Sequence, residues 1–255
     1  MTELLRAEIE AEFQNATRAP SRRAIMPFIT IAVPALDEAG YIAQCIESLV
    51  AQWPAEACEI LVLDGGSTDG TQAIVEALAL RHPHVRLVAN PRRIQSAAMN
   101  LAARIASPRA SVMVRADAHA LYPQGFVRRC VGELLRTGAT SVVVPMRTVA
   151  EPHHAMQRAI AAAQSSRFGN GGAAHRVASA SCFVDHGHHA AFDLAFFRSI
   201  GGYDESFTHN EDAEFDHRAA LAGGRVWMAA EAPVIYFPRR SIAALARQYF
   251  KHGAG

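Results

Sequence analysis

Between residues 27 and 145, short apolar runs alternate with helical patterns, and this alternation limits the possible folds more than any other feature of the chain. The apolar runs are FITIAVPAL, EILVLD, VRLVA, SVMVRADA and TSVVVP. Helical patterns separate them at about residues 39–52, 69–81, 94–106 and 123–136. Such runs are typical of strands that are buried on both faces of a parallel sheet. The alternation therefore predicts an α/β fold with a mostly parallel sheet flanked by helices.

The sequence changes character at two places along the chain. Residues 1–26 carry a short helical pattern and then a polar, basic stretch, which predicts a loosely attached lead-in. Residues 27–145 contain the alternation of strands and helices. From residue 146 to residue 255 the chain becomes helical, glycine-rich and histidine-rich, and we expect a second lobe that packs on the first. This half ends in a basic amphipathic helix at residues 239–252.

Composition and charge exclude several classes of protein. Half of the residues are hydrophobic and 19% are charged, which is too apolar for an intrinsically disordered chain. The 25 Lys and Arg residues balance 24 Asp and Glu residues, so no nucleic-acid partner is expected. The N-terminus lacks the basic start and apolar run of a secretory signal, and no uncharged stretch reaches the roughly 18–20 residues of a membrane span. We therefore expect a cytoplasmic protein.

Polar residues follow the predicted strands at the edge of the sheet where ligands bind in open α/β folds. At residues 34–38, Pro34 ends a strand and Glu38 precedes a helix, so helix capping alone can explain the acids there. In the loop DGGSTDGT, residues 67–69 can cap the next helix, whereas Asp64 is not needed for a cap. The Asp64 carboxylate has either a structural role or a contact with a nucleoside.

Two further strand ends and one histidine cluster carry residues that could bind a metal or take part in catalysis. Asp117 and His119 occupy positions i and i+2 of a segment that we expect to be extended, so that both side chains project to one side and can bind a metal. A structural role for this pair has equal weight. Residues 209–214 hold more carboxylates than a helix cap requires, and one of them can be a general base. The histidines at 186–189 match no closed zinc site, so we favour hydrogen bonds to a sugar or phosphate.

Four motifs occur in the order found in one enzyme family. They are VPALDEAGYIAQCIESLVAQ, LVLDGGSTDGT, RADAHA and GGYDESFTHNEDAEFDHRAALAGGRVW. Together they resemble family 2 glycosyltransferases with the GT-A fold, over roughly residues 27–252. The forms RADAHA, VDHGHHAAF and ALARQYFKHG are most similar to bacterial exopolysaccharide enzymes of the succinoglycan-biosynthesis type. The resemblance implies a Rossmann-like nucleotide-sugar-binding half at residues 27–145 and an α-rich acceptor-binding and catalytic half of the same domain at residues 146–255.

The resemblance also implies a donor site for a UDP-sugar. Asp64 corresponds to the residue that contacts the base, and Asp117 corresponds to the second Asp of the D-x-D motif, which holds a divalent metal, Mn²⁺ or Mg²⁺, on the diphosphate. Arg115 replaces the first Asp, which often holds the ribose, and this departure leaves His119 as a helper ligand of the metal. The donor-binding residues implied in this way are Pro34, Glu38, Asp64, Arg93, Arg115, Ala116 and Asp117.

On the acceptor side, Asp212 matches the general base of the family, with Glu211 beside it. The implied reaction is an inverting transfer of a sugar to a growing glycan or a polyprenyl-diphosphate-linked oligosaccharide in exopolysaccharide synthesis. It would take place at the inner face of the plasma membrane. Residues 239–252 would either contact the anionic membrane surface or, with equal weight, pack against the protein core as a terminal helix. Relatives usually continue into membrane-associated segments, so we expect the natural chain to extend beyond Gly255.

Two other functions compete with this interpretation. The first is a non-catalytic sugar-nucleotide or polysaccharide-binding protein that keeps the fold, and Arg115 at the first D-x-D position is its best support. Retention of Asp117, Glu211 and Asp212 argues against it, because a binding module needs no base. The second is a nucleotidyltransferase on a related α/β fold, which would release pyrophosphate instead of UDP. No glycine-rich opening of the pyrophosphorylase kind favours it.

Overall fold

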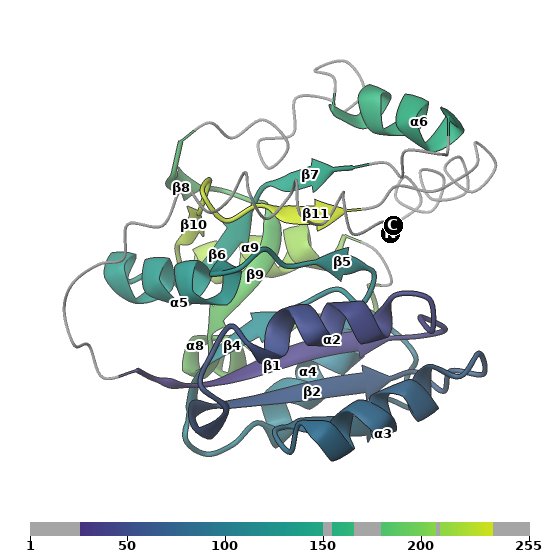
Figure 1. Cartoon of the computed structure of the whole chain (residues 1–255). Coiled ribbons are helices and arrows are strands. Elements are labelled where there is room, and N and C mark those ends of the chain that lie inside the picture. The colour runs from purple at the N-terminus through teal and green to yellow at the C-terminus, as the bar shows by residue number, and fades with distance from the viewer. Residues whose placement is uncertain (1–25, 150–154, 166–179, 208–209, 237–255) are drawn as a thin grey trace.

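The computed structural model describes residues 26–149, 155–165, 180–207 and 210–236 (Figure 1). A mixed eight-stranded sheet has the strand order β3-β2-β1-β4-β9-β6-β10-β8. Its strands are β1 (Phe28–Ala35), β2 (Cys58–Asp64), β3 (Val85–Ala89), β4 (Ala110–Arg115), β6 (Ser141–Val144), β8 (Cys182–Val184), β9 (His188–Asp193) and β10 (Val226–Met228). The predicted basic helix at 239–252 and the predicted lead-in, apart from Met26, lie outside the described residues.

The parallel part of the sheet confirms the prediction from the apolar runs. Strands β3, β2, β1 and β4 pair in parallel, and every residue of β2 is buried. The helices that connect or flank the strands are α2 (Ile42–Val50), α3 (Thr71–Arg81), α4 (Gln95–Ile105) and α5 (Phe126–Thr137). All four lie where helical patterns were predicted, with boundaries that differ by up to three residues. Burial on both faces explains why these strands read as continuous apolar runs.

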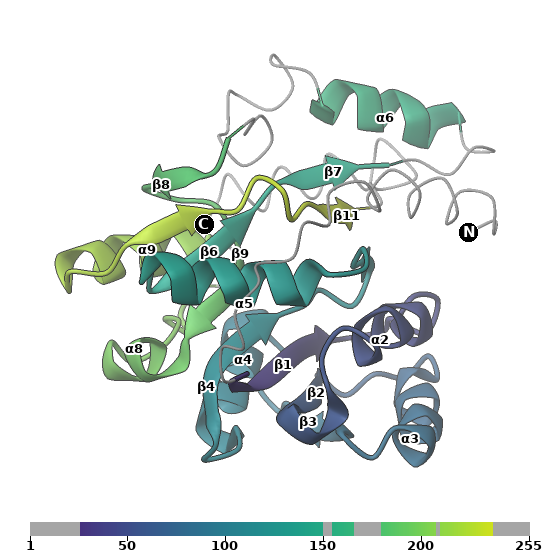
Figure 2. The same ribbon diagram turned by 60° about the vertical axis from the view of Figure 1, so that its left-hand side comes forward.

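Helices cover both faces of the sheet, and a large hydrophobic core lies on each face (Figures 1 and 2). Helices α2, α3 and α5 pack on one face, where they meet Ile31, Val62 and Val114. The other face packs against α4, α8 (Leu194–Ser199) and α9 (Glu211–Leu221), and Phe192 and Phe215 lie in that core. Among the described residues, no helix combines the length and the apolar character needed to cross a membrane.

The second half of the chain, where we expected a lobe that packs on the first, contributes strands to the large sheet. Strand β9 lies between β4 and β6 and runs antiparallel to both, and β10 pairs with β6, so this half completes the same sheet. These strands are three to six residues long, and β9 reads HHAAFD, so they present no apolar run for sequence analysis to detect. A small sheet of β5 (Ala120–Leu121), β11 (Val234–Tyr236) and β7 (Met146–Thr148) lies near α6 (Ala155–Ser165) (Figure 1).

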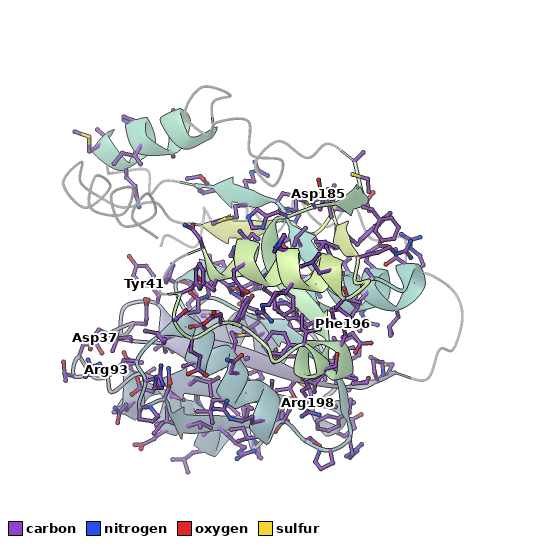
Figure 3. All side chains as sticks on the ribbon, turned by 180° about the vertical axis from the view of Figure 1, so that it is seen from behind. Asp37, Tyr41, Arg93, Asp185, Phe196 and Arg198 are labelled. Atoms are coloured by element: carbon purple, nitrogen blue, oxygen red, sulfur yellow. The ribbon has the colours of Figure 1, made fainter. Side chains whose placement is uncertain are left out.

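The candidate binding and catalytic residues lie along one edge of the large sheet. The register places Asp64 of β2 beside Ala35 of β1, and Ala32 of β1 beside Arg115 of β4, so these strands end together. Because β9 is antiparallel to β4, its first residues return to the same edge. Figure 3 shows Asp37 and Arg93 close together at one side of the molecule. The topology therefore joins the ends of β1, β2 and β4 with the start of β9.

Candidate active site

The loops after β1 and β2 are tied together by hydrogen bonds between side chains and backbone. Each loop supplies acceptors for backbone N–H groups of the other. The bonds run from Asp37 N to Ser67 Oγ (2.8 Å), from Glu38 N to Thr71 Oγ1 (2.8 Å), from Ala39 N to Asp69 Oδ2 (2.9 Å) and from Thr68 N to Asp37 Oδ1 (2.8 Å). The polar residues of this motif therefore fix the two loops relative to each other. The residue that caps α3 is Gly70, whose φ of 98° favours glycine.

Asp64 organises its own loop. Its Oδ2 accepts hydrogen bonds from Gly66 N (2.8 Å), Ser67 N (3.0 Å) and Gln72 Nε2 (2.8 Å), and its Oδ1 accepts one from Ser67 Oγ (2.5 Å). Within the described residues Oδ1 accepts that single bond, so it keeps the capacity to accept a second from a ligand. Asp64 therefore has the structural role, and its geometry is also compatible with a nucleoside contact.

A cavity of about 430 Å³ opens beside Asp64. It is lined by Asp64, Gly65, Gly66, Gln72, Leu87, Ala89, Asn90, Pro91 and Arg93. Two of the predicted donor-site residues, Asp64 and Arg93, are therefore in its wall, whereas Pro34 and Glu38 are not. Arg93 and the nearby Asp37 have φ values of 60° and 55°, a conformation that costs energy for residues other than glycine and is enriched at functional sites. The volume lies in the range of small-molecule pockets.

Arg115 connects the end of β4 with the start of α9. Its Nη1 donates to Asp212 Oδ1 at 2.6 Å, and its Nε donates to Asp117 Oδ1 at 3.3 Å. Glu211 Oε1 lies 3.9 Å from the same Nη1. The Arg115 side chain is 6% exposed. The residue that departs from the D-x-D motif thus binds both the expected metal-binding carboxylate and the expected base. Ala116, also predicted for the donor site, is fully buried and bonds through its backbone to β1.

Asp117 has a different local geometry from the one expected. Ala120 N donates to Asp117 O, so the chain turns after Asp117, and the expected extended arrangement with His119 is wrong. His119 Nδ1 lies 2.9 Å from Glu38 Oε1. Gln95 Nε2 donates to Asp117 Oδ1 at 3.1 Å, and His188 Nε2 lies 3.4 Å from Asp117 Oδ2. Burial alone raises the pKa of Asp117, but Arg115 and His188 outweigh burial and lower that pKa.

The Asp212 carboxylate lies in a buried network of polar groups. Tyr203 Oη donates to Asp212 Oδ1 at 3.1 Å, and His189 Nδ1 lies 3.3 Å from the same oxygen. Burial alone raises the pKa of Asp212, yet Arg115 and His189 hold that pKa well below its usual value. Burial and the charge of Asp212 raise the pKa of Glu211. The two neighbouring acids therefore differ in character, with Asp212 strongly ionised.

Sequence reasoning missed Tyr203, Gln95 and Asp216 as members of this site. Asp216 is 2% exposed and lies 2.8 Å from His189 Nε2. A signal was present, because Asp212 and Asp216 are four residues apart and share a face of α9. The histidines of residues 186–189 do gather at this edge, with His188 beside Asp117 and His189 beside Asp212.

The chain matches the protein-family model described as "Glycosyl transferase family 2" over residues 30–201. The chain belongs to this family. It is a glycosyltransferase, and it is 44% identical over 225 residues to the "Succinoglycan biosynthesis protein ExoA" of Rhizobium meliloti (strain 1021). That alignment covers 88% of this chain and 68% of the relative.

Solved structures with the GT-A fold resemble this glycosyltransferase at low sequence identity. The mannosyltransferase PcManGT from Pyrobaculum calidifontis, in complex with GDP-Man and Mn²⁺, has a TM-score of 0.64 at 23% identity. The matched region covers 98% of this chain and 70% of the PcManGT chain. S. aureus TarS has a TM-score of 0.62 at 16% identity and covers 84% of this chain. This chain spans 37% of TarS. These likenesses establish the fold that the motifs predicted.

Proposed function

We propose that this glycosyltransferase is metal-dependent and inverting, and that it moves a sugar from a UDP-sugar to a growing glycan or lipid-linked oligosaccharide in exopolysaccharide synthesis. One observation carries the proposal. Asp212 Oδ1 accepts bonds from Arg115 and Tyr203, whereas Oδ2 accepts none from the described residues, and the side chain is 18% exposed. An oriented carboxylate with one open oxygen suits a general base. The relative named for succinoglycan biosynthesis supports the choice of product.

In this mechanism Asp212 Oδ2 takes the proton of an acceptor hydroxyl. The hydroxyl oxygen forms a bond to the anomeric carbon while the bond from that carbon to the phosphate oxygen breaks, and UDP leaves with the electron pair. A single displacement inverts the configuration. A carboxylate of low pKa is sufficient, because the attacking hydroxyl becomes strongly acidic as its new bond forms. The low pKa also keeps Asp212 ionised before each turnover.

The donor end of the site fits a divalent cation that has few protein ligands. The described residues contain no group of three or more His, Cys, Asp or Glu side chains that could hold a metal. Mg²⁺ is commonly held by one or two carboxylates together with substrate phosphates and water. Asp117 Oδ2 is the oxygen that can serve, because Oδ1 accepts hydrogen bonds from Arg115 and Gln95. The neighbour of Oδ2 among the described residues is His188 Nε2 at 3.4 Å. When bound, the cation supplies positive charge to the leaving diphosphate.

The remaining parts of the proposal concern the binding partners. We assign the cavity beside Asp64 and Arg93 to the uridine of the donor, since it lies at the ends of β2 and β3. The acceptor is a glycan or a polyprenyl-diphosphate-linked oligosaccharide, presented at the inner face of the plasma membrane. The segment that would contact the anionic membrane surface, residues 239–252, lies outside the described residues.

The experiment that tests the proposal compares Asp212→Asn with Glu214→Gln. Glu214 stands in the same turn of α9 but pairs with Arg218. UDP release from UDP-glucose and UDP-galactose is measured with a polyprenyl-diphosphate-linked oligosaccharide as acceptor. We expect Asp212→Asn to lower transfer by about 10²–10⁴-fold, the usual contribution of a general base. Glu214→Gln should keep transfer within about twofold, since Glu214 pairs with Arg218 and a glutamine amide oxygen can still accept from that guanidinium.

Calorimetric titration of UDP, with Mn²⁺, Mg²⁺ or EDTA, completes the test. UDP affinity should need the cation and should be unchanged in Asp212→Asn, because a base on the acceptor side does not hold the nucleotide. Loss of UDP binding in folded Asp212→Asn would contradict the assignment of the base. Equal binding in EDTA would contradict metal dependence, and full transfer by Asp212→Asn would contradict the mechanism.

A further inference from the structure

A chain of side chains leads from Asp212 away from the proposed acceptor and ends at the surface. Tyr203 Oη lies 2.8 Å from His189 Nδ1, and His189 Nε2 lies 2.8 Å from Asp216 Oδ1. The other oxygen of Asp216, Oδ2, lies 2.9 Å from His186 Nδ1. The relative exposure is 1% for His189 and 2% for Asp216, whereas the side chain of His186 is 45% exposed. Three of the five groups, Tyr203, His189 and Asp216, are therefore held inside the protein.

The hydrogen-bond geometry is consistent with a doubly protonated His189. Asp216 is ionised and only accepts, so His189 Nε2 must carry a proton. Tyr203 Oη directs its single proton to Asp212 Oδ1, so it accepts from its other neighbours, which are His189 Nδ1 and Arg115 Nη1. With the hydroxyl proton directed to Asp212, His189 Nδ1 donates to Tyr203 Oη and carries a proton as well. Both ring nitrogens donate, and His189 is an imidazolium.

The charges around His189 agree with this assignment. Two carboxylates of α9 face the ring, Asp212 at Nδ1 and Asp216 at Nε2, and the neutral Tyr203 faces Nδ1 from the loop before α9. Its neighbour on β9, His188, has a pKa that burial lowers, and Arg115 of β4 binds the same Asp212 oxygen. Burial alone lowers the pKa of His189, but Asp216 and Asp212 outweigh burial and raise it to about 9.

Asp216 cannot act on the acceptor itself. Both of its oxygens are bound by histidines, and the rings of Phe192 and Phe215 enclose His189 at centroid distances of 4.9 and 5.4 Å. Without the imidazolium, two carboxylates one helical turn apart would repel each other. Any influence of Asp216 on the reaction therefore has to pass through His189.

We infer that Asp216 is a positioning residue for the general base: it holds His189 protonated and oriented, and His189 with Tyr203 holds the Asp212 carboxylate so that Oδ2 faces the acceptor. This inference rests on the proposed function of Asp212. It assigns a role in the reaction to a carboxylate that reaches neither the proposed donor nor the proposed acceptor.

The test is the pH dependence of transfer for wild type, Asp216→Asn and Asp185→Asn at saturating UDP-sugar. Asp185 is an exposed carboxylate on the segment that carries the histidines, so Asp185→Asn is the matched control (Figure 3). Wild type and control should keep their rates within about twofold from pH 6 to pH 8. In Asp216→Asn the pKa of His189 falls toward its ordinary value of about 6.5, so the rate at pH 8 should be about tenfold or more below the rate at pH 6.

The outcomes separate positioning from simple structural support. A fall of the rate by the same factor at every pH, or an unchanged profile in folded Asp216→Asn, overturns the inference. Asp216→Glu returns a carboxylate and should move the alkaline limb back toward that of wild type. Full activity of Asp212→Asn would instead overturn the proposed function, whatever the profile of Asp216→Asn.

A second measurement decides the matter if Asp216→Asn does not fold. The ¹⁵N NMR spectrum of histidine-labelled wild-type protein reports the protonation state of the His189 ring directly. The signals of His189 are assigned as those that are missing from the spectrum of His189→Gln. We expect both nitrogens of His189 to remain protonated at pH 8. A neutral ring at pH 7 overturns the inference.

Discussion

The two sides of the site are held by different kinds of interaction. On the proposed nucleotide side, the loops after β1 and β2 are tied by side chains that bind backbone N–H groups, such as Ser67 to Asp37 and Thr71 to Glu38. On the proposed acceptor side, charged side chains bind one another, as Arg115 binds Asp212 and His189 binds Asp216. The hydrogen bonds on the proposed nucleotide side join the loop after β1 to the loop after β2. The ion pairs on the proposed acceptor side join β4, β9 and α9.

This difference predicts how strongly substitutions on each side should lower the stability of the protein. A bond between a hydroxyl and an amide contributes about 1 kcal/mol, and its loss leaves neutral groups near water. Removing one partner of a buried ion pair leaves an uncompensated charge and costs several times more. The acceptor side should therefore tolerate substitution much less well than the nucleotide side. The predictions that follow test this contrast.

The largest effect is expected for Arg115→Met, because it leaves Asp117 and Asp212 without their shared cation. We expect a loss of about 3–5 kcal/mol in the free energy of unfolding, measured with urea at pH 7. The matched control is Arg81→Met, which removes an exposed pair with Glu47 and should cost no more than about 1 kcal/mol. Equal costs for the two substitutions would remove the contrast between buried and exposed charges.

An intermediate effect is expected from alkaline pH. The pKa of His189 is raised to about 9 in the folded protein, above its usual value of 6.5. The stability that it contributes is therefore complete below about pH 6.5 and is lost as the pH rises through 9. We expect the free energy of unfolding to fall by roughly 1–3 kcal/mol between pH 7 and pH 10 on this account.

The part of this fall in the free energy of unfolding that is due to His189 is isolated by comparing wild type with Asp216→Asn. Buried cysteines also weaken the fold at alkaline pH, since burial raises the pKa of the Cys58 thiol to about 12, but they do so in both proteins. Urea unfolding at the two pH values should show a smaller fall for Asp216→Asn than for wild type. An equal fall would mean that Asp216 does not raise the pKa of His189.

The smallest effect is expected for Ser67→Ala on the nucleotide side. The substitution removes two hydrogen bonds, one donated to Asp64 and one accepted from Asp37 N. We expect a cost of about 1–2 kcal/mol in urea unfolding. Ser111, exposed at the start of the described β4 strand, provides the control Ser111→Ala, with a change within about 0.5 kcal/mol. A cost for Ser67→Ala as large as that of Arg115→Met would reverse the contrast.

The parallel half of the fold and the order of its motifs were predictable from the sequence. The apolar runs predicted β1 to β4, and the helical patterns predicted α2 to α5, because burial on both faces leaves a strong signal in sequence. Strands β8 to β10 were not predicted, since they are short and β9 begins with two histidines. Their place in the sheet depends on pairing with strands far along the chain.

For the site, the sequence by itself determined which residue types lie at the strand ends and at the start of α9. It pointed to Asp64, Asp117 and Asp212 through motifs, which are local patterns. Only the tertiary structure decided the partners: Arg115 and Asp212 are 97 residues apart, and His189 and Asp216 are 27 apart. The physical reason is that the strength of an ion pair depends on distance and burial in space. Sequence spacing fixes neither once the chain has turned back across the sheet.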